Sequence, residues 1–106
     1  MYNPDEWVII KINGTDPHYR LFGSWSGSWC AAEEWRMNSG IVSVNETDTH
    51  YVFNGYSGSS YKCPKNSYGI RNAFNSSICN SFVKSGEGTV ELLEEMPDIM
   101  NIDWII

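Results

Sequence analysis

Short apolar or alternating runs follow one another along most of the chain, a pattern that is typical of β-strands. Residues 6–12 are rich in β-branched and aromatic side chains and stop at Asn13-Gly14, which is a turn signal. Residues 18–22 alternate polar and apolar positions, so these two runs predict a β-hairpin. Further strands are expected at residues 40–44, 49–53, 60–63 and 89–93.

One segment has the period of a helix instead. Its apolar residues, spaced to share one helical face, are Ile70, Ala73, Phe74, Ile78 and Phe82. They predict one helix over about residues 68–83. A cap at Asn66 or Ser67 would start it, and its end is expected near Gly86 or Ser85. Asn and Ser fill the other positions and favour a helix only weakly, so it needs a sheet to pack on. The expected fold class is therefore α+β, a small, mainly antiparallel twisted sheet with one packed helix.

Length and composition indicate a single domain over residues 1–106. A hydrophobic content of 42%, with five Trp and six Tyr, excludes a disordered chain. The length suffices for one core. No apolar run approaches the roughly 20 residues that span a bilayer, so no membrane partner is expected. No basic segment leads into an apolar run at the start of the sequence, which predicts a cytoplasmic protein.

The cysteines form an odd set without a CxxC pair: Cys30, Cys63 and Cys79. Such a set supports neither a zinc site nor a disulfide framework. Reduced thiols are the expected state. We expect no metal and no cofactor.

The net charge of −6 is unevenly distributed. Acidic and basic side chains balance over residues 1–86, whereas residues 87–106 carry acids and no base. A chain of this charge is not expected to bind duplex nucleic acid, because nonspecific binding needs a basic footprint. A small phosphate-bearing ligand needs only a few local cations. We interpret the acidic tail as a solvated face in preference to a docking element or a nucleic-acid mimic.

Two segments repeat an unusual mixture of aromatic, glycine and serine residues. Residues 22–29 read FGSWSGSW, and residues 53–61 read FNGYSGSSY. A basic residue and an Asn-Ser pair follow each copy, within residues 36–39 and 65–67. The expected ligand-binding residues are Trp25, Ser26, Gly27, Ser28, Trp29, Arg36, Asn38, Ser39, Tyr56, Ser57, Gly58, Ser59, Lys65, Asn66, Ser67 and Tyr68.

These residue types suit a flat, anionic ligand of the nucleotide type. Glycines let the backbone approach a ligand, successive N–H groups form anion sites, and aromatic faces stack bases. Arg36 and Lys65 are expected to supply the positive charge. Lys11 and Arg20 are less well placed for this role, because they lie on the first predicted hairpin. Ordinary hairpin turns and core aromatics would explain the same residues without a ligand. If the two copies are structurally equivalent, their turns line one groove.

No combination of residues indicates catalysis. His18 and His50 each lie in a predicted strand, where a lone His is more often packed or exposed than a base. The adjacent carboxylates of Glu33 and Glu34 point different ways on a turn, and Cys30 has no His near it in the sequence. No Walker loop, HExxH helix or GxSxG elbow occurs. We therefore expect a protein that is not an enzyme.

The segments FGSWSGSW…WRMNSGI and VFNGYSGSSYKCPKNSYGI resemble small proteins of tailed bacteriophages, and among these the anti-CBASS proteins that act as sponges. The resemblance covers about residues 19–70. It implies immune evasion in the bacterial host cytosol by a homo-oligomer that sequesters a cyclic oligonucleotide without cleaving it. It assigns no individual contact residue.

Three functions follow as alternatives. The leading one is a non-enzymatic binder that sequesters a nucleotide-type defence signal. The second is a protein–protein inhibitor of a host defence enzyme, since Tyr and Trp are also enriched at interfaces. The third, a hydrolase of the signal, is disfavoured because the sequence has no metal-ligand cluster or general base.

The C-terminal segment is unusually apolar for a chain end. Termini of this kind are tied into the core or into a partner subunit. We expect a homo-oligomer, either a dimer or a tetramer. The apolar residues that favour it are Ile99, Met100, Ile102, Trp104, Ile105 and Ile106.

Overall fold

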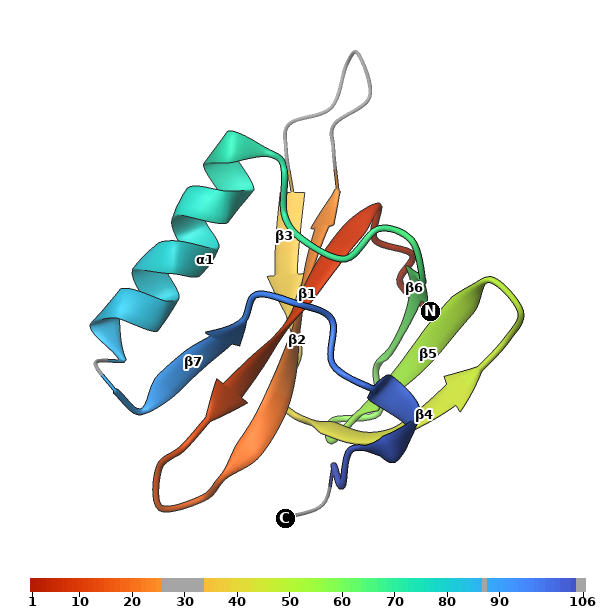
Figure 1. The fold of residues 1–106 in the computed structure, drawn as a ribbon, viewed down its shortest axis with the longest axis horizontal. Helices are drawn as coiled ribbons and strands as arrows, with labels where there is room; N and C mark the ends of the chain where they lie inside the picture. Colours follow the sequence, from red (N-terminus) through yellow and green to blue (C-terminus); the bar gives the residue numbers. More distant parts are fainter. Residues whose placement is uncertain (26–33, 87, 105–106) are drawn as a thin grey trace.

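The computed structural model describes residues 1–25, 34–86 and 88–104, and Figure 1 shows their arrangement. Within these ranges the elements follow in the order β1 (Glu6–Ile12), β2 (His18–Trp25), β3 (Glu34–Met37), β4 (Ile41–Glu46), β5 (His50–Gly55), β6 (Ser60–Pro64), α1 (Ala73–Ser85), β7 (Val90–Leu93) and η1 (Ile99–Asn101), a 3-10 helix. None of the described helices has the length and apolar character needed to cross a membrane.

The strands form two antiparallel sheets. One sheet has the order β3-β2-β1-β7, and the other has the order β4-β5-β6. β1 and β2 pair from Glu6↔Ser24 to Ile12↔His18, which confirms the predicted hairpin. The predicted α+β class is confirmed as well, with the strands divided between two sheets and one helix packed on the larger sheet.

β1 is the centre of the molecule because both of its faces are buried. Trp7 and Ile9 pack into the core between the two sheets, whereas Val8 and Ile10 pack into the core beneath α1. The larger sheet is thus the middle layer, with α1 on one side and β4–β6 on the other (Figure 1). A strand covered on both faces needs a continuous apolar run, which explains why residues 6–12 do not alternate.

The helix begins at Ala73, later than predicted, with Asn72 as its N-cap and Gly86 as its C-cap. Its buried face agrees only in part with the prediction. Asn75 and Cys79 are buried, with Ile78 and Phe82 packed beside them, whereas Phe74 is 57% exposed. The apolar spacing therefore predicted the packed face correctly at Ile70, Ile78 and Phe82, and it was wrong at Ala73 and Phe74, which are exposed.

Asn75 explains this register because it is a buried polar residue with two partners on the sheet. Its Nδ2 donates to Ser24 Oγ (2.7 Å) and to the Glu34 carbonyl (2.9 Å). Buried polar groups need such partners, so the helix turns this amide toward β2 and β3. The Asn75 side chain cannot be recognised as buried from its residue type.

The segment before the helix is not helical because β1 holds it. Gly69 N donates to the Trp7 carbonyl (2.8 Å), and Arg71 N donates to Glu6 Oε1 (3.0 Å). The Tyr68 hydroxyl lies between β1 and β7: it accepts from Ile9 N (3.1 Å) and donates to the Leu93 carbonyl. These bonds exclude residues 68–71 from the predicted helix.

β3 was not predicted from the sequence. Its four residues pair with the last four residues of β2, from Phe22↔Met37 to Trp25↔Glu34. They lie mostly exposed at the edge of the sheet. Such a short, mixed segment has too little periodicity to identify a strand.

The C-terminal residues are partly tied into the core. Ile99 is 1% exposed and Trp104 is 8% exposed, and the Trp104 ring packs edge-on against Tyr19 and Phe53. Met100 remains half-exposed, and residues 105–106 lie outside the described ranges. Ile99 and Trp104 therefore no longer support the homo-oligomer, which stays a prediction.

Candidate functional site

The two sequence copies occupy different places in the fold. The first begins in β2 of the larger sheet, and its residues Ser26–Trp29 lie outside the described ranges. The second begins in β5 of the smaller sheet, forms a turn and ends in β6. The turn of the second copy contains Gly58 at φ 94°, a conformation that favours glycine. The described parts of the copies are therefore not equivalent.

Trp25 and Tyr56, which match in the repeat, lie far apart. Trp25 is at the last position of β2, half-buried and edge-on to Tyr2 at 6.4 Å between ring centroids. Tyr56 lies near His18, at the opposite end of β2. Eight strand residues span roughly 20 Å or more, so the two rings cannot stack on one small ligand.

Arg36 and Lys65 already have partners within the protein. The Arg36 guanidinium lies 4.4 Å from the centre of the Tyr2 ring. Lys65 Nζ lies 2.7 Å from Glu46 Oε2 and 5.0 Å from the centre of the Tyr51 ring. The hydrogen bond to Glu46 raises the pKa of Lys65. Lys65 follows the end of β6 that pairs with His50, whereas the Ser57-Gly58-Ser59 turn lies at the other end of β5 and β6. The Ser26-Gly27-Ser28 turn, which Arg36 was expected to serve, lies outside the described ranges.

Two other predicted site residues hold the fold together. Asn38 is buried, and its Oδ1 accepts from Leu21 N (2.8 Å). The Tyr68 ring packs edge-on against Trp7, and burial raises the pKa of Tyr68 to about 12. The neighbouring Asn66 and Ser67 bond to each other, with Ser67 Oγ donating to Asn66 Oδ1 (3.3 Å).

The structure does bring Ser39 and Gly40, which come after the first copy in the sequence, onto the turn of the second copy. Ser57 N donates to Ser39 Oγ (3.2 Å), and Tyr56 N donates to the Gly40 carbonyl (2.8 Å). Gly40 is held at φ 148°, and a Cβ placed on it would lie 3.5 Å from His18 Cδ2 and 4.0 Å from Tyr56 Cβ. Ser39, Tyr56 and Ser57 are thus predicted site residues that meet beside the start of β2. Gly58 and Ser59 complete this turn.

A groove of about 520 Å³ opens at this place. Its lining residues are Asp16, Pro17, His18, Arg20, Ser39, Gly40, Ile41, Val42, Tyr56 and Trp104. Tyr56 is 82% exposed and Trp104 is buried, so an aromatic face remains available at the rim while another closes the base. The groove combines apolar surface with a few polar groups, as small-molecule sites do.

Arg20 is the cation of this groove. Its Nε donates to His18 Nε2 at 2.9 Å, and His18 Nδ1 lies 2.7 Å from the Asp16 carbonyl oxygen. Because a guanidinium can only donate, His18 Nε2 is an acceptor and Nδ1 carries the proton. Within the described ranges Arg20 has no salt bridge to a carboxylate, so its two Nη groups remain available.

His18, Arg20 and Trp104 were not predicted as site residues. The alternating pattern of residues 18–22 already placed His18 and Arg20 on one face of a strand, and that was the signal that could have identified them. Trp104 gave no such signal, because only the tertiary fold brings the C-terminal segment to β2.

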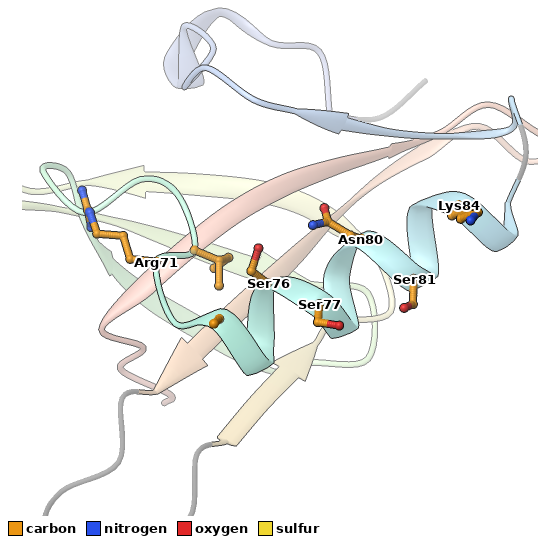
Figure 2. A pocket seen from close by; sticks show the side chains of 8 residues that line it. Arg71, Ser76, Ser77, Asn80, Ser81 and Lys84 are labelled. Atoms are coloured by element: carbon orange, nitrogen blue, oxygen red, sulfur yellow. The ribbon is translucent and has the colours of Figure 1, made fainter.

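A second hollow, of about 460 Å³, follows the outer face of α1. Figure 2 shows its side chains strung along the helix rather than converging on one point. The labelled residues are Arg71, Ser76, Ser77, Asn80, Ser81 and Lys84. Arg71 Nη1 lies 2.8 Å from Glu6 Oε2, so one of the two cations already has a carboxylate partner. The hollow has the character of a solvated helix face.

Catalytic groups do not converge in the described part of the chain. Cys63 and Cys79 are buried, which raises the pKa of both thiols, that of Cys79 to about 11. A raised pKa disfavours the nucleophilic thiolate. His50 Nδ1 lies 2.7 Å from the neighbouring Thr49 Oγ1. Over the described ranges, no three His, Cys, Asp or Glu side chains form a metal-binding group. Cys30 and Glu33 lie outside those ranges.

Comparison with known proteins gives no match to a protein-family model, to a curated protein or to a solved structure.

Proposed function

We propose that this protein binds a small, flat, anionic ligand of the nucleotide type in the groove between β2 and the β5–β6 turn, without chemically changing it. The observation that carries the proposal is the pairing of Arg20 with Tyr56 across this groove. The guanidinium offers a planar fork for a phosphate, and the exposed phenol ring offers a face for a base.

Asp16 refines the chemistry of the ligand. A carboxylate in the same groove disfavours a bare anion, since it repels negative charge. It can accept hydrogen bonds from the amino or imino groups of a base. The groove therefore suits a ligand that carries N–H donors in addition to its phosphate.

In its finer form, the proposal is a bacteriophage sponge that sequesters a cyclic oligonucleotide defence signal. The resemblance of residues 19–70 to anti-CBASS proteins supports this form, and so does a groove with binding groups but no converging catalytic groups in the described residues. The experiment is to incubate the protein with a panel of cyclic di- and trinucleotides, measure binding by calorimetry, and release the ligand by heating. Intact recovery supports a sponge, and an altered product indicates a hydrolase. No uptake favours the protein–protein inhibitor.

Arg20 gives the first prediction. Arg20→Ala should weaken binding of the tightest nucleotide by about tenfold or more, because a charge-assisted bidentate contact is lost. Arg20→Lys should restore only part of the affinity, since an ammonium lacks the planar fork.

Tyr56→Ala should weaken binding by roughly 1–3 kcal/mol if the base stacks on this ring.

Arg36→Ala is the matched control, because Arg36 follows the first sequence copy and lies outside the groove. It should bind like the parent protein. Thermal unfolding of each variant checks that its fold is intact. If Arg36→Ala loses binding and Arg20→Ala keeps it, the site belongs to the repeated motif and the groove is not the ligand site.

A further inference from the structure

The cation of the groove, Arg20, is held by a hydrogen bond to a histidine, His18. We propose that His18 is the positioning residue for Arg20 and that protonation of His18 turns ligand binding off. This inference rests on the proposed function, because it assigns a regulator to the same groove.

Both ring nitrogens of His18 are engaged in the neutral form. Nε2 accepts from Arg20 Nε at 2.9 Å, and Nδ1–H donates to the Asp16 carbonyl at 2.7 Å. The Asp16 carbonyl fixes the tautomer, and the tautomer leaves Nε2 free to orient the guanidinium. With Nε committed to His18, the two Nη groups of Arg20 form the end that meets a phosphate.

Protonation removes the acceptor on which this arrangement depends. A proton on Nε2 would point at the Arg20 Nε–H, so two donors and two positive charges would face each other. Arg20 must then turn away, while the Nδ1–H bond to the Asp16 carbonyl persists. His18 also lies beside the Gly40 backbone, where a Cβ on Gly40 would be 3.5 Å from His18 Cδ2.

Few of the described groups around His18 carry a charge. Among the described residues that line the groove, the titratable side chains are Asp16, His18, Arg20 and Tyr56. From β1, the register partner of His18 is Ile12, and the crossing segment contributes Ser39 and Gly40, all uncharged.

Two effects on an anionic ligand oppose each other when His18 is protonated. The new positive charge attracts the ligand, but the groove is open to water and exposed charges are strongly screened. Loss of the aligned guanidinium removes a directional bidentate contact, which is the stronger kind of interaction. The net result is weaker binding in acid.

The test measures binding of cyclic di-AMP and cyclic di-GMP from about pH 5 to 8, the range in which histidine ordinarily titrates. Phosphodiesters keep their charge over this range, so a change reports on the protein. The parent protein should lose about tenfold in affinity from the top of the range to the bottom. Constant affinity, or affinity that rises in acid, overturns the proposal.

Variants separate positioning from simple packing. His18→Gln offers an amide oxygen to Arg20 and does not titrate, so its affinity should stay near that of the parent at high pH and become independent of pH. His18→Ala should bind weakly throughout. His50→Gln is the control, since His50 is a second strand histidine outside the groove, and it should keep the pH profile of the parent. A His18→Gln variant that retains this profile also overturns the proposal.

A ligand-free measurement separates failure of this inference from failure of the proposed function. Nitrogen-15 NMR should show the Nδ1–H tautomer of His18 at pH 8, and the Arg20 Nε–H resonance should shift as His18 is protonated. If no nucleotide binds but this shift is present, the proposed function is wrong and the positioning by His18 is supported. If the Arg20 Nε–H resonance does not shift as the pH is lowered, the inference that His18 positions Arg20 is wrong, whether or not a nucleotide binds.

Discussion

Single side chains join parts of this fold that the backbone alone leaves separate. Tyr68 is the clearest case, because Ile9 and Leu93 are register partners and the Tyr68 hydroxyl hydrogen-bonds to both. The phenol thus replaces a direct bond of the β1–β7 ladder. Its residue type suggested a stacking platform for a ligand, but its position between two strands makes it structural.

Tyr68→Phe should lower the free energy of unfolding by about 1–3 kcal/mol, since Ile9 N–H and the Leu93 carbonyl would both lose a partner. Burial raises the pKa of Tyr68 from its usual value of 10.0 to about 12. Its contribution should therefore be complete below pH 10 and be lost as the pH rises toward 12. Urea unfolding at neutral and alkaline pH measures both effects. Tyr56→Phe, at an exposed ring, is the control, and equal stability of Tyr68→Phe and the parent would contradict this account.

At the scale of elements, the fold was largely predictable where the burial pattern is local. Residues 6–12 and 18–22 identified a hairpin, because a continuous apolar run followed by a turn signal and an alternating run has few other solutions. The start of α1 was not predictable, since hydrogen bonds to β1 hold the preceding residues out of the helix. The register of α1 depends on Asn75, whose burial arises from partners in β2 and β3.

Neighbouring residues of the helix test this register. Asn75→Ala should cost about 1–3 kcal/mol of stability because Ser24 Oγ and the Glu34 carbonyl lose their donor. Phe74→Ala, at a side chain that is 57% exposed, should change stability by no more than about 0.5 kcal/mol. Urea unfolding of both variants decides the matter. A larger loss for Phe74→Ala would show that the apolar spacing of the sequence describes the buried face better.

At the scale of the whole molecule, the candidate site combines segments that are separate in the sequence. Ser39 and Tyr56 were predicted from their chemistry, whereas Arg20 was set aside because it lies on the first hairpin. The sequence copies suggested a symmetry between Arg36 and Lys65 that the two sheets do not preserve. Only the crossing from β3 to β4 brings Gly40 between His18 and Tyr56.

Assembly is the remaining prediction at this scale. Ile99 and Trp104 are buried within one chain, while Met96 and Met100 are 40% and 46% exposed. A dimer or tetramer would cover such methionines. Light scattering at micromolar concentration should give a mass above that of one 12.1 kDa chain. A monomeric mass would contradict the predicted homo-oligomer. The groove would then be formed by a single chain alone.

The central position of β1 has a consequence for the order of folding. Ile12 pairs with His18 through a short turn, but it also pairs with Val90 across most of the described chain. Local contacts close quickly, and contacts between distant residues form late. We therefore expect the β1–β2 hairpin to form before β7 pairs with β1, so that one edge of an almost entirely apolar strand stays open during that interval. Until β7 pairs with it, this open edge of β1 can pair with a strand of another chain, so we expect aggregation to compete with folding at this stage.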